Sequence, residues 1–461
     1  MKEKIVLIGA GSAMFTRGMV ADMIKRRQEC ELALVDIDPE ALKVAEKLAA
    51  KMMAMGKCSV KVKLSAATDH CDVLKDATVV ICTIGVGGRR AWEQDVFIPR
   101  KYGIYQPVGD SVMPGGTSRA LRMIPAMIAI AKDVLDLAPR ALFFNYGNPM
   151  GPICRAVRKA TGANMVGLCH GVMNTARSLA TELEADGKCF SYTAMGMNHC
   201  TWFTESRVDG RDAMPDLIKI ADKRLKNTIL TGEIGVKFEE DGSVKAGADA
   251  GLDPFCWRLM KLFGAFPAPN DRHVTEFFPS FFPNGAYYGK KLGIDAFSFE
   301  GCIAHGDKIY DEMREDALSG RPLGQSYFEL IQGEHEQVFD IIDSIRNETD
   351  RVYSANLPNH GQIPNLPEDS IVEAPAVADG AGLRPIMQKT LPSGIAGTLA
   401  SRLMWQETVV EAALEGSRSK FIQALVLDGA VSSIDNATLL ADELLAAHAA
   451  YLPQFRKGAK K

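Results

Sequence analysis

The first part of the chain alternates short apolar runs with segments of helical periodicity, and this alternation limits the fold more than any other feature. The segments 13–27 and 39–55 carry apolar residues at helical spacing, and the second begins with a proline, which a first helical turn tolerates. Runs typical of buried strands lie at residues 4–9, 32–36, 60–64, 78–83, 141–145 and 164–169. Because such alternation builds parallel sheets with crossover helices, we expect a Rossmann-like, doubly wound α/β fold.

The regularity is lost after about residue 200, which suggests a second domain. Residues 202–260 mix polar helix-like segments with a Gly/Asp-rich loop at 232–251, and helical periodicity returns over 324–346 and 399–427. The tail 455–461 is expected to fray. No linker or repeat interrupts the chain. We therefore expect a dinucleotide-binding domain at 1–195, intertwined with an α+β domain for substrate binding and oligomerisation at 196–461.

Charge and cysteine usage narrow the possible partners. A formal net charge of -4 gives no electrostatic footprint for nucleic acid or an acidic membrane, so we expect a small-molecule substrate. No run approaches the roughly 20 apolar residues of a membrane span, and the first residues resemble a strand, not a signal peptide. The 10 cysteines show no paired spacing, which fits thiols in a reducing cytoplasm.

The first chemical signal is the turn Gly9-Ala10-Gly11-Ser12 between a predicted strand and a predicted helix. Gly9 allows the tight turn, and Gly11 allows a pyrophosphate to approach the helix that follows Ser12. Asp36 ends the next strand, where an acid can bond the ribose hydroxyls, which favours NAD over NADP. The alternative is a structural turn without a ligand.

Two further strand ends carry candidate binding residues. Gly85 lies in a second glycine-rich turn, which either faces the nicotinamide or is an ordinary flexible loop. Asn148 follows the fifth predicted strand and can bind neutral hydroxyls, or it only caps the next helix.

The pairs Cys169-His170 and Asn198-His199 are the sharpest local feature. A thiolate and an imidazole at a strand edge can hold a divalent transition metal and leave coordination positions open for a substrate. By spacing alone, buried core residues remain the more common explanation.

Several motifs in a fixed order point to a family. They are residues 9–16, residues 110–125 with Arg119 and Arg122, residues 145–150, residues 169–172, Asn198-His199 with Trp202, Asn365-Leu366-Pro367, and Val372-Glu373-Ala374-Pro375. Over nearly its whole length, the chain resembles family 4 glycoside hydrolases.

This resemblance implies an unusual hydrolytic reaction. NAD+ removes hydride from C3 of the sugar, a base takes the C2 proton, and the glycosidic oxygen is eliminated. Water then adds and NADH returns the hydride. The resemblance also implies a divalent metal, usually Mn2+, with Ni2+, Co2+ or Fe2+ as alternatives, and a homodimer or homotetramer.

By motif match, Cys169 and His199 are the expected metal ligands, and Asn148 and Asn198 touch the substrate or the metal's surroundings. His170 follows the metal cysteine at the position of the leaving-group acid in phospho-glycosidase members, and an imidazole can serve there. The base has no clean match.

The stretch that corresponds to the missing base offers three candidates. Asp271 is the preferred one, with His273 and Glu276 as alternatives. A purely structural role for the whole stretch also stays open.

The resemblance also narrows the substrate. Phospho-glycosidases of the family place a phosphate-binding arginine just before an acidic run, where this chain has Trp92. The Cys-His pair and the following Gly171-Val172 resemble members that cleave unphosphorylated α-linked uronic acids. We expect an α-galacturonidase, with α-glucuronidase and α-galactosidase as alternatives. Candidate partners of the sugar carboxylate are Arg89, Arg90, Arg119 and Arg272.

Two hypotheses other than a glycosidase stay open. A malate- or lactate-type NAD-dependent dehydrogenase shares the glycine turn, the ribose acid and an asparagine at a strand end, but needs no thiolate ligand. A non-catalytic dinucleotide sensor would leave the metal pair idle.

Overall fold

The computed structural model of the protein describes most of the chain. The described residues are 3–12, 15–27, 29–55, 62–185, 188–226, 228, 236–238, 244–246, 252–329 and 336–456. The Gly/Asp-rich loop predicted at 232–251 lies largely outside these ranges, as does most of the tail predicted to fray.

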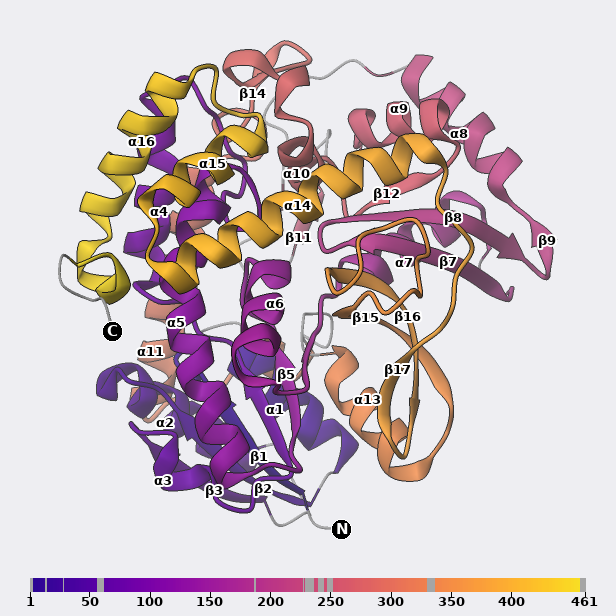
Figure 1. Ribbon diagram of the computed structural model, residues 1–461. Helices are drawn as coiled ribbons and strands as arrows, with labels where there is room; N and C mark the ends of the chain where they lie inside the picture. Colours follow the sequence, from indigo (N-terminus) through magenta and orange to yellow (C-terminus); the bar gives the residue numbers. More distant parts are fainter. Residues whose placement is uncertain are drawn as a thin grey trace.

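Parallel strands form the first part of a large sheet, as the alternating pattern predicts (Figure 1). Their order is β3-β2-β1-β4-β5-β6, the order of a doubly wound nucleotide-binding fold. The strands are β1 (Glu3–Ile8), β2 (Cys30–Val35), β3 (Val62–Ala67), β4 (Val79–Cys82), β5 (Leu142–Asn145) and β6 (Met165–Gly167). Successive residues such as Ile5, Val6 and Leu7 are fully buried, because helices cover both faces of a parallel sheet.

Helices connect these strands, and the first two of them follow the predicted periodicity. They are α1 (Phe15–Arg26), α2 (Pro39–Met55), α3 (Cys71–Leu74), α4 (Gly88–Arg100), α5 (Met113–Leu137), α6 (Met150–Thr161) and α7 (Gly171–Glu182). The predicted helix 39–55 coincides with α2. Strand β3 ends later than the predicted run 60–64, whose first two residues lie outside the described ranges. This edge strand is only half-buried, so its apolar signal is weak.

Antiparallel strands continue the same sheet into the second half of the chain. The order from β6 onward is β15-β16-β7-β8-β12, with β17 on β16 and β9 on β8. The added strands are β7 (Phe190–Met197), β8 (Cys200–Val208), β9 (Arg211–Asp212), β12 (Phe266–Ala268), β15 (Arg351–Pro358), β16 (Ile371–Asp379) and β17 (Gly382–Pro385). Residues 195 and 196, where a boundary between two domains is predicted, lie inside β7.

Smaller pairings and short turns complete the strands. Two-stranded sheets pair β10 (Val236–Phe238) with β11 (Val244–Ala246), and β13 (Ala286–Tyr287) with β14 (Lys290–Lys291). The 3₁₀ turns are η1 (Thr275–Phe277), η2 (Pro279–Phe281), η3 (Pro283–Gly285), η4 (Ala449–Tyr451) and η5 (Pro453–Phe455).

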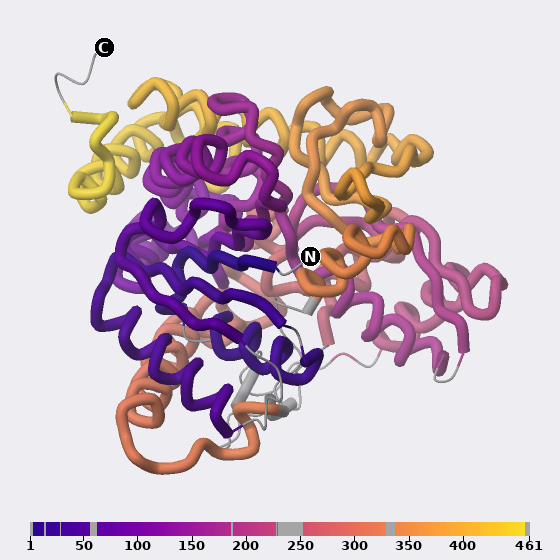
Figure 2. The backbone as a smooth tube through the Cα atoms, turned by 90° about the horizontal axis from the view of Figure 1, so that it is seen from below, coloured from indigo at the N-terminus to yellow at the C-terminus, as the bar shows by residue number. Residues whose placement is uncertain are grey.

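The last helices fold back onto the first half of the chain. Helix α14 (Ser393–Glu415) packs on α5 and α6, α15 (Arg418–Asp428) on α5, and α16 (Ile434–Ala447) on α4, as Figures 1 and 2 show. The remaining helices are α8 (Met214–Lys226), α9 (Pro254–Phe263), α10 (Asp271–Val274), α11 (Phe299–Leu318), α12 (Ser326–Glu329) and α13 (Glu336–Asn347). Among the described residues, no helix combines the length and apolarity needed to cross a bilayer.

A buried ion pair fixes the packing between α4, α5 and the chain end. The Arg122 guanidinium donates to both carboxylate oxygens of Asp95, at 2.9 and 2.5 Å, and both side chains are fully buried. His448 Nε2 lies 2.9 Å from Asp95 Oδ1. The C-terminal segment is thereby tied to helices that flank the parallel strands.

Candidate active site

The turn after β1 is closed tightly by its glycines. Gly9 has a φ of +94°, and its amide donates to the carbonyl of Val35 at 2.8 Å. The Ser12 amide donates to the Gly9 carbonyl at 3.1 Å. A Cβ atom on Gly9 would lie 2.8 Å from the backbone nitrogen of Ile84. The structure thus packs the predicted first and second glycine-rich turns against each other.

Asp36 lies beside this turn at the end of β2. The Gly11 amide donates to Asp36 Oδ2 at 2.8 Å, and the Asp38 amide donates to Oδ1 at 3.0 Å. A Cβ atom on Gly11 would lie only 2.7 Å from Asp36 Oδ2, so no larger residue fits without displacing the carboxylate. This arrangement fits the predicted role of Asp36 toward a ribose.

Two arginines of α5 support the second turn, which contains Gly85. Arg122 Nε donates to the carbonyl of Val86 at 2.9 Å. A Cβ atom on Gly85 would lie 3.4 Å from Arg119 Nη2. The turn is therefore backed by fixed side chains, which argues against the alternative of an ordinary flexible loop.

Asn148 faces the loop that precedes α5. Its Nδ2 donates to Asp110 Oδ2 at 3.0 Å, and its carbonyl accepts a hydrogen bond from Arg119 Nε at 2.9 Å. Its Oδ1 is buried and has no hydrogen-bond partner among the described residues. The alternative that Asn148 only caps a helix is wrong, because α6 begins at Met150 with Pro149 as its N-cap.

Cys169 and His199 come together, as the metal prediction requires. Cys169 Sγ and His199 Nε2 lie 3.5 Å apart. Cys169 follows β6, and its sulfur accepts the Gly171 amide at 3.4 Å. His199 lies in the tight turn between β7 and β8, with a φ of +64°. Its Nδ1 lies 2.7 Å from Ser111 Oγ, which fixes the ring with Nε2 toward the sulfur.

Asp110 and His273 complete a cluster around His199. One donor atom from each of these three residues lies within 4.8 Å of the others. The rings of His199 and His273 have centroids 4.1 Å apart. Ser111 Oγ donates to Asp110 Oδ1 at 2.7 Å, so the same hydroxyl positions both Asp110 and His199.

The cluster keeps its imidazoles neutral. Burial lowers the pKa of His199 to about 4. The positive charges of His170 and Arg272 also lower this pKa, whereas the negative charge of Asp110 raises it. Burial also holds the pKa of His273 well below its usual range, with the charges of His199, Arg272 and His170 acting in the same direction. Neutral imidazole is the form that ligates a metal, so the donor set fits a divalent transition metal.

The second asparagine candidate is held by a buried acid. Asn198 Nδ2 donates to Glu373 Oε2 at 3.4 Å, and the Thr201 hydroxyl donates to the same oxygen at 2.9 Å. Burial raises the pKa of Glu373 to about 7. Asn198 Oδ1 is buried without a hydrogen-bond partner among the described residues, like the corresponding atom of Asn148.

Asp271 lies apart from this cluster. It is fully buried, and its two oxygens accept the amides of Phe255 and Cys256 at the start of α9, each at 2.7 Å. The Tyr287 hydroxyl donates to it at 2.6 Å. This placement fits a structural role for Asp271, which the sequence analysis left open. Of the three candidate bases, the structure brings His273 into the cluster.

The four candidate arginines lie in three places. Arg119 lies beside Gly85 of the second glycine-rich turn and donates to the Asn148 carbonyl. Arg89 and Arg90 both pair with Asp307 of α11, Arg89 through Nε at 2.6 Å. Arg272, in contrast, is close enough for its charge to lower the pKa values of His199 and His273. Its Nη2 donates to Cys302 at 3.0 Å, while its buried Nε has no partner among the described residues.

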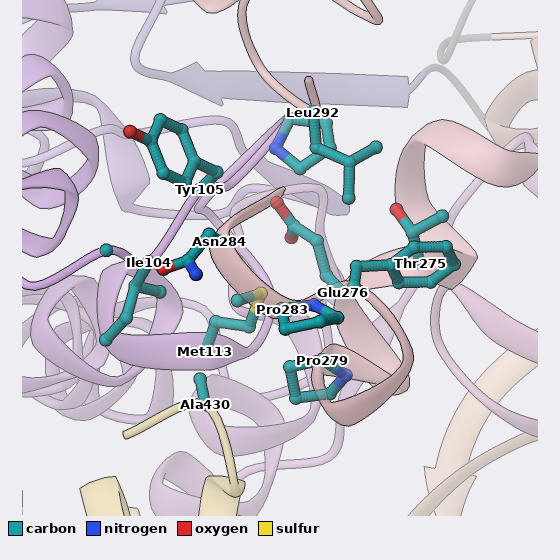
Figure 3. A pocket seen from close by; sticks show the side chains of 13 residues that line it. Ile104, Tyr105, Met113, Thr275, Glu276, Pro279, Pro283, Asn284, Leu292 and Ala430 are labelled. Carbon is teal, nitrogen blue, oxygen red and sulfur yellow. The ribbon is translucent and has the colours of Figure 1, made fainter. Parts of the chain in front are cut away.

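Glu276 holds the loop that carries Asp110. Its Oε1 accepts the amides of Val108 and Gly109, both at 2.8 Å. Burial raises the pKa of Glu276 to about 8. Figure 3 shows Glu276 among the side chains that line a small cavity of about 60 Å³. The Glu276 carboxyl thus holds the loop backbone, and this structural role accounts for its burial without a role as the catalytic base.

Sequence reasoning missed Asp110 as a possible ligand and named His273 only as a possible base. Asp110 stands in a family motif, but its position relative to the cysteine depends on contacts across the sheet. His273 belongs to a short helix in an irregular segment. The local signal that could have pointed to Asp110 is its pairing with Ser111 just before α5.

The fold and this site define an enzyme of the Rossmann-like class with a candidate metal centre. The comparisons with known proteins then identify the family. The family model "Family 4 glycosyl hydrolase" matches residues 4–185, and the model of that family's C-terminal domain matches residues 194–431. The chain belongs to family 4 of the glycosyl hydrolases. This result excludes the dehydrogenase and sensor alternatives.

Curated relatives span nearly the whole chain. An alpha-glucosidase of Erwinia rhapontici is 33% identical, with 96% of this chain and 97% of the relative covered. An alpha-galactosidase of Rhizobium meliloti (strain 1021) is 30% identical, with 98% and 89% covered. An alpha-galacturonidase of Bacillus subtilis (strain 168) is 29% identical, with 92% of each covered.

Solved structures share the fold. A Bacillus subtilis protein provisionally described as a glucosidase superimposes with a TM-score of 0.82 at 27% identity, covering 96% of this chain and 100% of that one. A 6-phospho-alpha-glucosidase from gut microorganisms, solved in complex with NAD and Mn2+, gives a TM-score of 0.82 at 20% identity, covering 98% and 100%.

Proposed function

We propose that this family 4 glycosidase hydrolyses unphosphorylated α-linked uronic acid glycosides, α-galacturonides first among them. The observation that carries the proposal is the position of Arg272, which directly precedes His273 of the cluster in α10 and whose charge acts on His199 and His273. The buried Nε of this guanidinium has no partner among the described residues and can bind a sugar carboxylate through a charge-assisted hydrogen bond.

The cofactors we propose are NAD and a divalent metal, Mn2+ before Ni2+, Co2+ or Fe2+. Gly9, Gly11, Ser12, Asp36 and Gly85 would hold the dinucleotide, as the turn geometry supports. Cys169 and His199 would hold the metal, with Asp110 as a third donor. When bound, NAD supplies reversible hydride acceptance and the metal supplies Lewis-acid polarisation of the sugar oxygens.

The chain's own residues then bind the sugar and move its protons. The Oδ1 atoms of Asn148 and Asn198, which have no partner within the part of the chain that the structure describes, accept hydrogen bonds from sugar hydroxyls. His170, whose charge acts on His199 and His273, gives a proton to the leaving oxygen. His273 stays unprotonated at neutral pH and is our candidate to take the C2 proton.

Trp92 supports an unphosphorylated substrate. It stands where phospho-members carry an arginine, donates its indole N–H to the Val108 carbonyl at 2.7 Å and packs edge-on against Phe299. This position therefore offers no guanidinium to a sugar phosphate.

The test is an assay of purified protein with NAD+, Mn2+ and a thiol reductant on p-nitrophenyl α-galacturonide. We expect nitrophenol release without net NADH, and deuterium at C2 of the sugar when the reaction runs in D2O. Product without label at C2 would contradict the elimination route. Parallel assays on the α-galactoside and α-glucoside test the neutral alternative, which the relatives at 30% and 33% identity favour. Higher kcat/KM on either would overturn the uronide preference.

A further inference from the structure

A second group of metal-type donors lies on the surface, in the turn between β3 and α3. Asp69, His70 and Cys71 are consecutive, and one donor atom of each lies within 4.8 Å of the others. Asp69 and Cys71 are exposed, and His70 is half-buried. The group shares no residue with the candidate active site, and α3 packs against α5 at the lower left of Figure 1.

We propose that Asp69, His70 and Cys71 form a second binding site for a divalent transition metal with the ligand preferences of zinc. The three residues offer a sulfur, an imidazole nitrogen and a carboxylate oxygen, the donor types that zinc takes in proteins. Three protein ligands leave a further position for water. The site is therefore an open one, unlike the closed four-ligand centres that hold small domains together.

Asp133 of α5 orients the imidazole for this role. His70 Nε2 lies 2.8 Å from Asp133 Oδ2, while His70 Nδ1 lies 3.9 Å from Asp69 Oδ1. A histidine that ligates a metal commonly donates its other ring N–H to a carboxylate, which fixes the tautomer and the ring. Here Asp133 takes Nε2, so Nδ1 is the coordinating atom and already faces the carboxylate ligand.

The local backbone brings the sulfur to the same place. The Cys71 amide donates to Asp69 Oδ1 at 2.9 Å, which folds Asp69 and Cys71 toward each other across His70. The Cys71 sulfur thereby lies within 4.8 Å of the donor atoms of Asp69 and His70.

Co2+ titration tests the site, because cobalt replaces zinc in such donor sets and gives a thiolate-to-metal absorption band. The protein is first stripped with a chelator, and Cys169→Ser removes the sulfur of the active-site cluster. In this background we expect one thiolate band, and its loss when Cys71→Ser is added. Cys189→Ser is the matched control, because Cys189 is also an exposed free cysteine.

Asp133→Asn tests the positioning role separately. Replacing a partner of this kind costs about 10–100-fold in metal affinity, so the cobalt titration should shift by that factor while the band persists. The proposal is overturned if the Cys169→Ser protein shows no thiolate band, or if the band survives Cys71→Ser. Thermal melts and far-UV circular dichroism confirm that each variant is folded. The cobalt band and its loss in Cys71→Ser are measured without glycosidase activity. A failure of this proposal therefore does not affect the proposed function.

Discussion

Replacing Arg122 by methionine should cost about 3–5 kcal/mol of unfolding free energy, because it takes the guanidinium away from the buried Asp95 carboxylate and leaves it beside the His448 ring. Arg122 and Asp95 are both fully buried, and two hydrogen bonds join them, at 2.9 and 2.5 Å. The long apolar stem of methionine fills much of the arginine's volume, so a cavity contributes little. The loss therefore reports on the charge and on the hydrogen bond that Arg122 Nε donates to the Val86 carbonyl.

Arg418→Met is the matched control. Arg418 also donates twice to one carboxylate, that of Asp442, at 2.6 and 2.8 Å, but the two side chains are 48% and 54% exposed. Exposed pairs contribute about 0–1 kcal/mol, so this variant should unfold close to wild type. The two pairs share their bonding pattern and differ in burial.

Equilibrium unfolding in urea, followed by circular dichroism and tryptophan fluorescence together, measures the difference. The double variant Arg122→Met with Asp95→Asn should recover much of the loss, because no buried charge is left unpaired. A cost below about 1 kcal/mol for Arg122→Met, or equal costs for the buried and exposed variants, would refute the reasoning. Arg122 Nε also holds the Val86 carbonyl, so dinucleotide affinity should fall as well.

Three further changes address the candidate site. Cys169→Ser should abolish metal-dependent turnover and leave NAD affinity within about twofold of wild type; turnover equal to wild type would remove Cys169 from the site. Arg272→Met should lower kcat/KM on an α-galacturonide by about 10- to 100-fold, the cost of losing a hydrogen bond to a charged group, with a smaller effect on an α-galactoside. Equal losses on both substrates would show that Arg272 does not meet the carboxylate. Burial raises the pKa of Glu276 from 4.5 to about 8, so its protonated form stabilises the fold fully below pH 4.5, and this contribution is lost as pH rises through 8. Glu276→Gln should therefore flatten the pH dependence of stability in that window, and an unchanged profile in urea titrations would contradict the assignment.

The sequence predicted those parts of the fold that depend on local pattern. The buried strands β1, β2 and β4 and the whole of α2 follow from apolar periodicity. The run 399–427 was predicted as helical without a break, and the structure divides it. Gly416 ends α14 in a left-handed conformation, and Ser417 caps α15 by accepting the Lys420 amide.

The site divides in the same way. Cys169 and His199 were found because each belongs to a recognisable motif. Asp110 was not assigned as a ligand, and His273 was only an alternative base, because their position near His199 depends on Ser111 and on packing across the sheet. The placement of Asp271 beneath α9 likewise depends on hydrogen bonds to Phe255, Cys256 and Tyr287 that no spacing rule predicts.

The two halves of the large sheet meet at narrow joints. Within the described residues, β15 pairs with β6 through one residue pair, Asn356 opposite Gly167, and β16 pairs with β7 through Glu373 opposite Gly196. The parallel strands β1 and β2, in contrast, are joined by six residue pairs. A tilt of the antiparallel strands against the parallel ones would therefore break few strand pairs, while the parallel strands keep their mutual register. We expect any bending that accompanies the exchange of a bound molecule to concentrate at these joints.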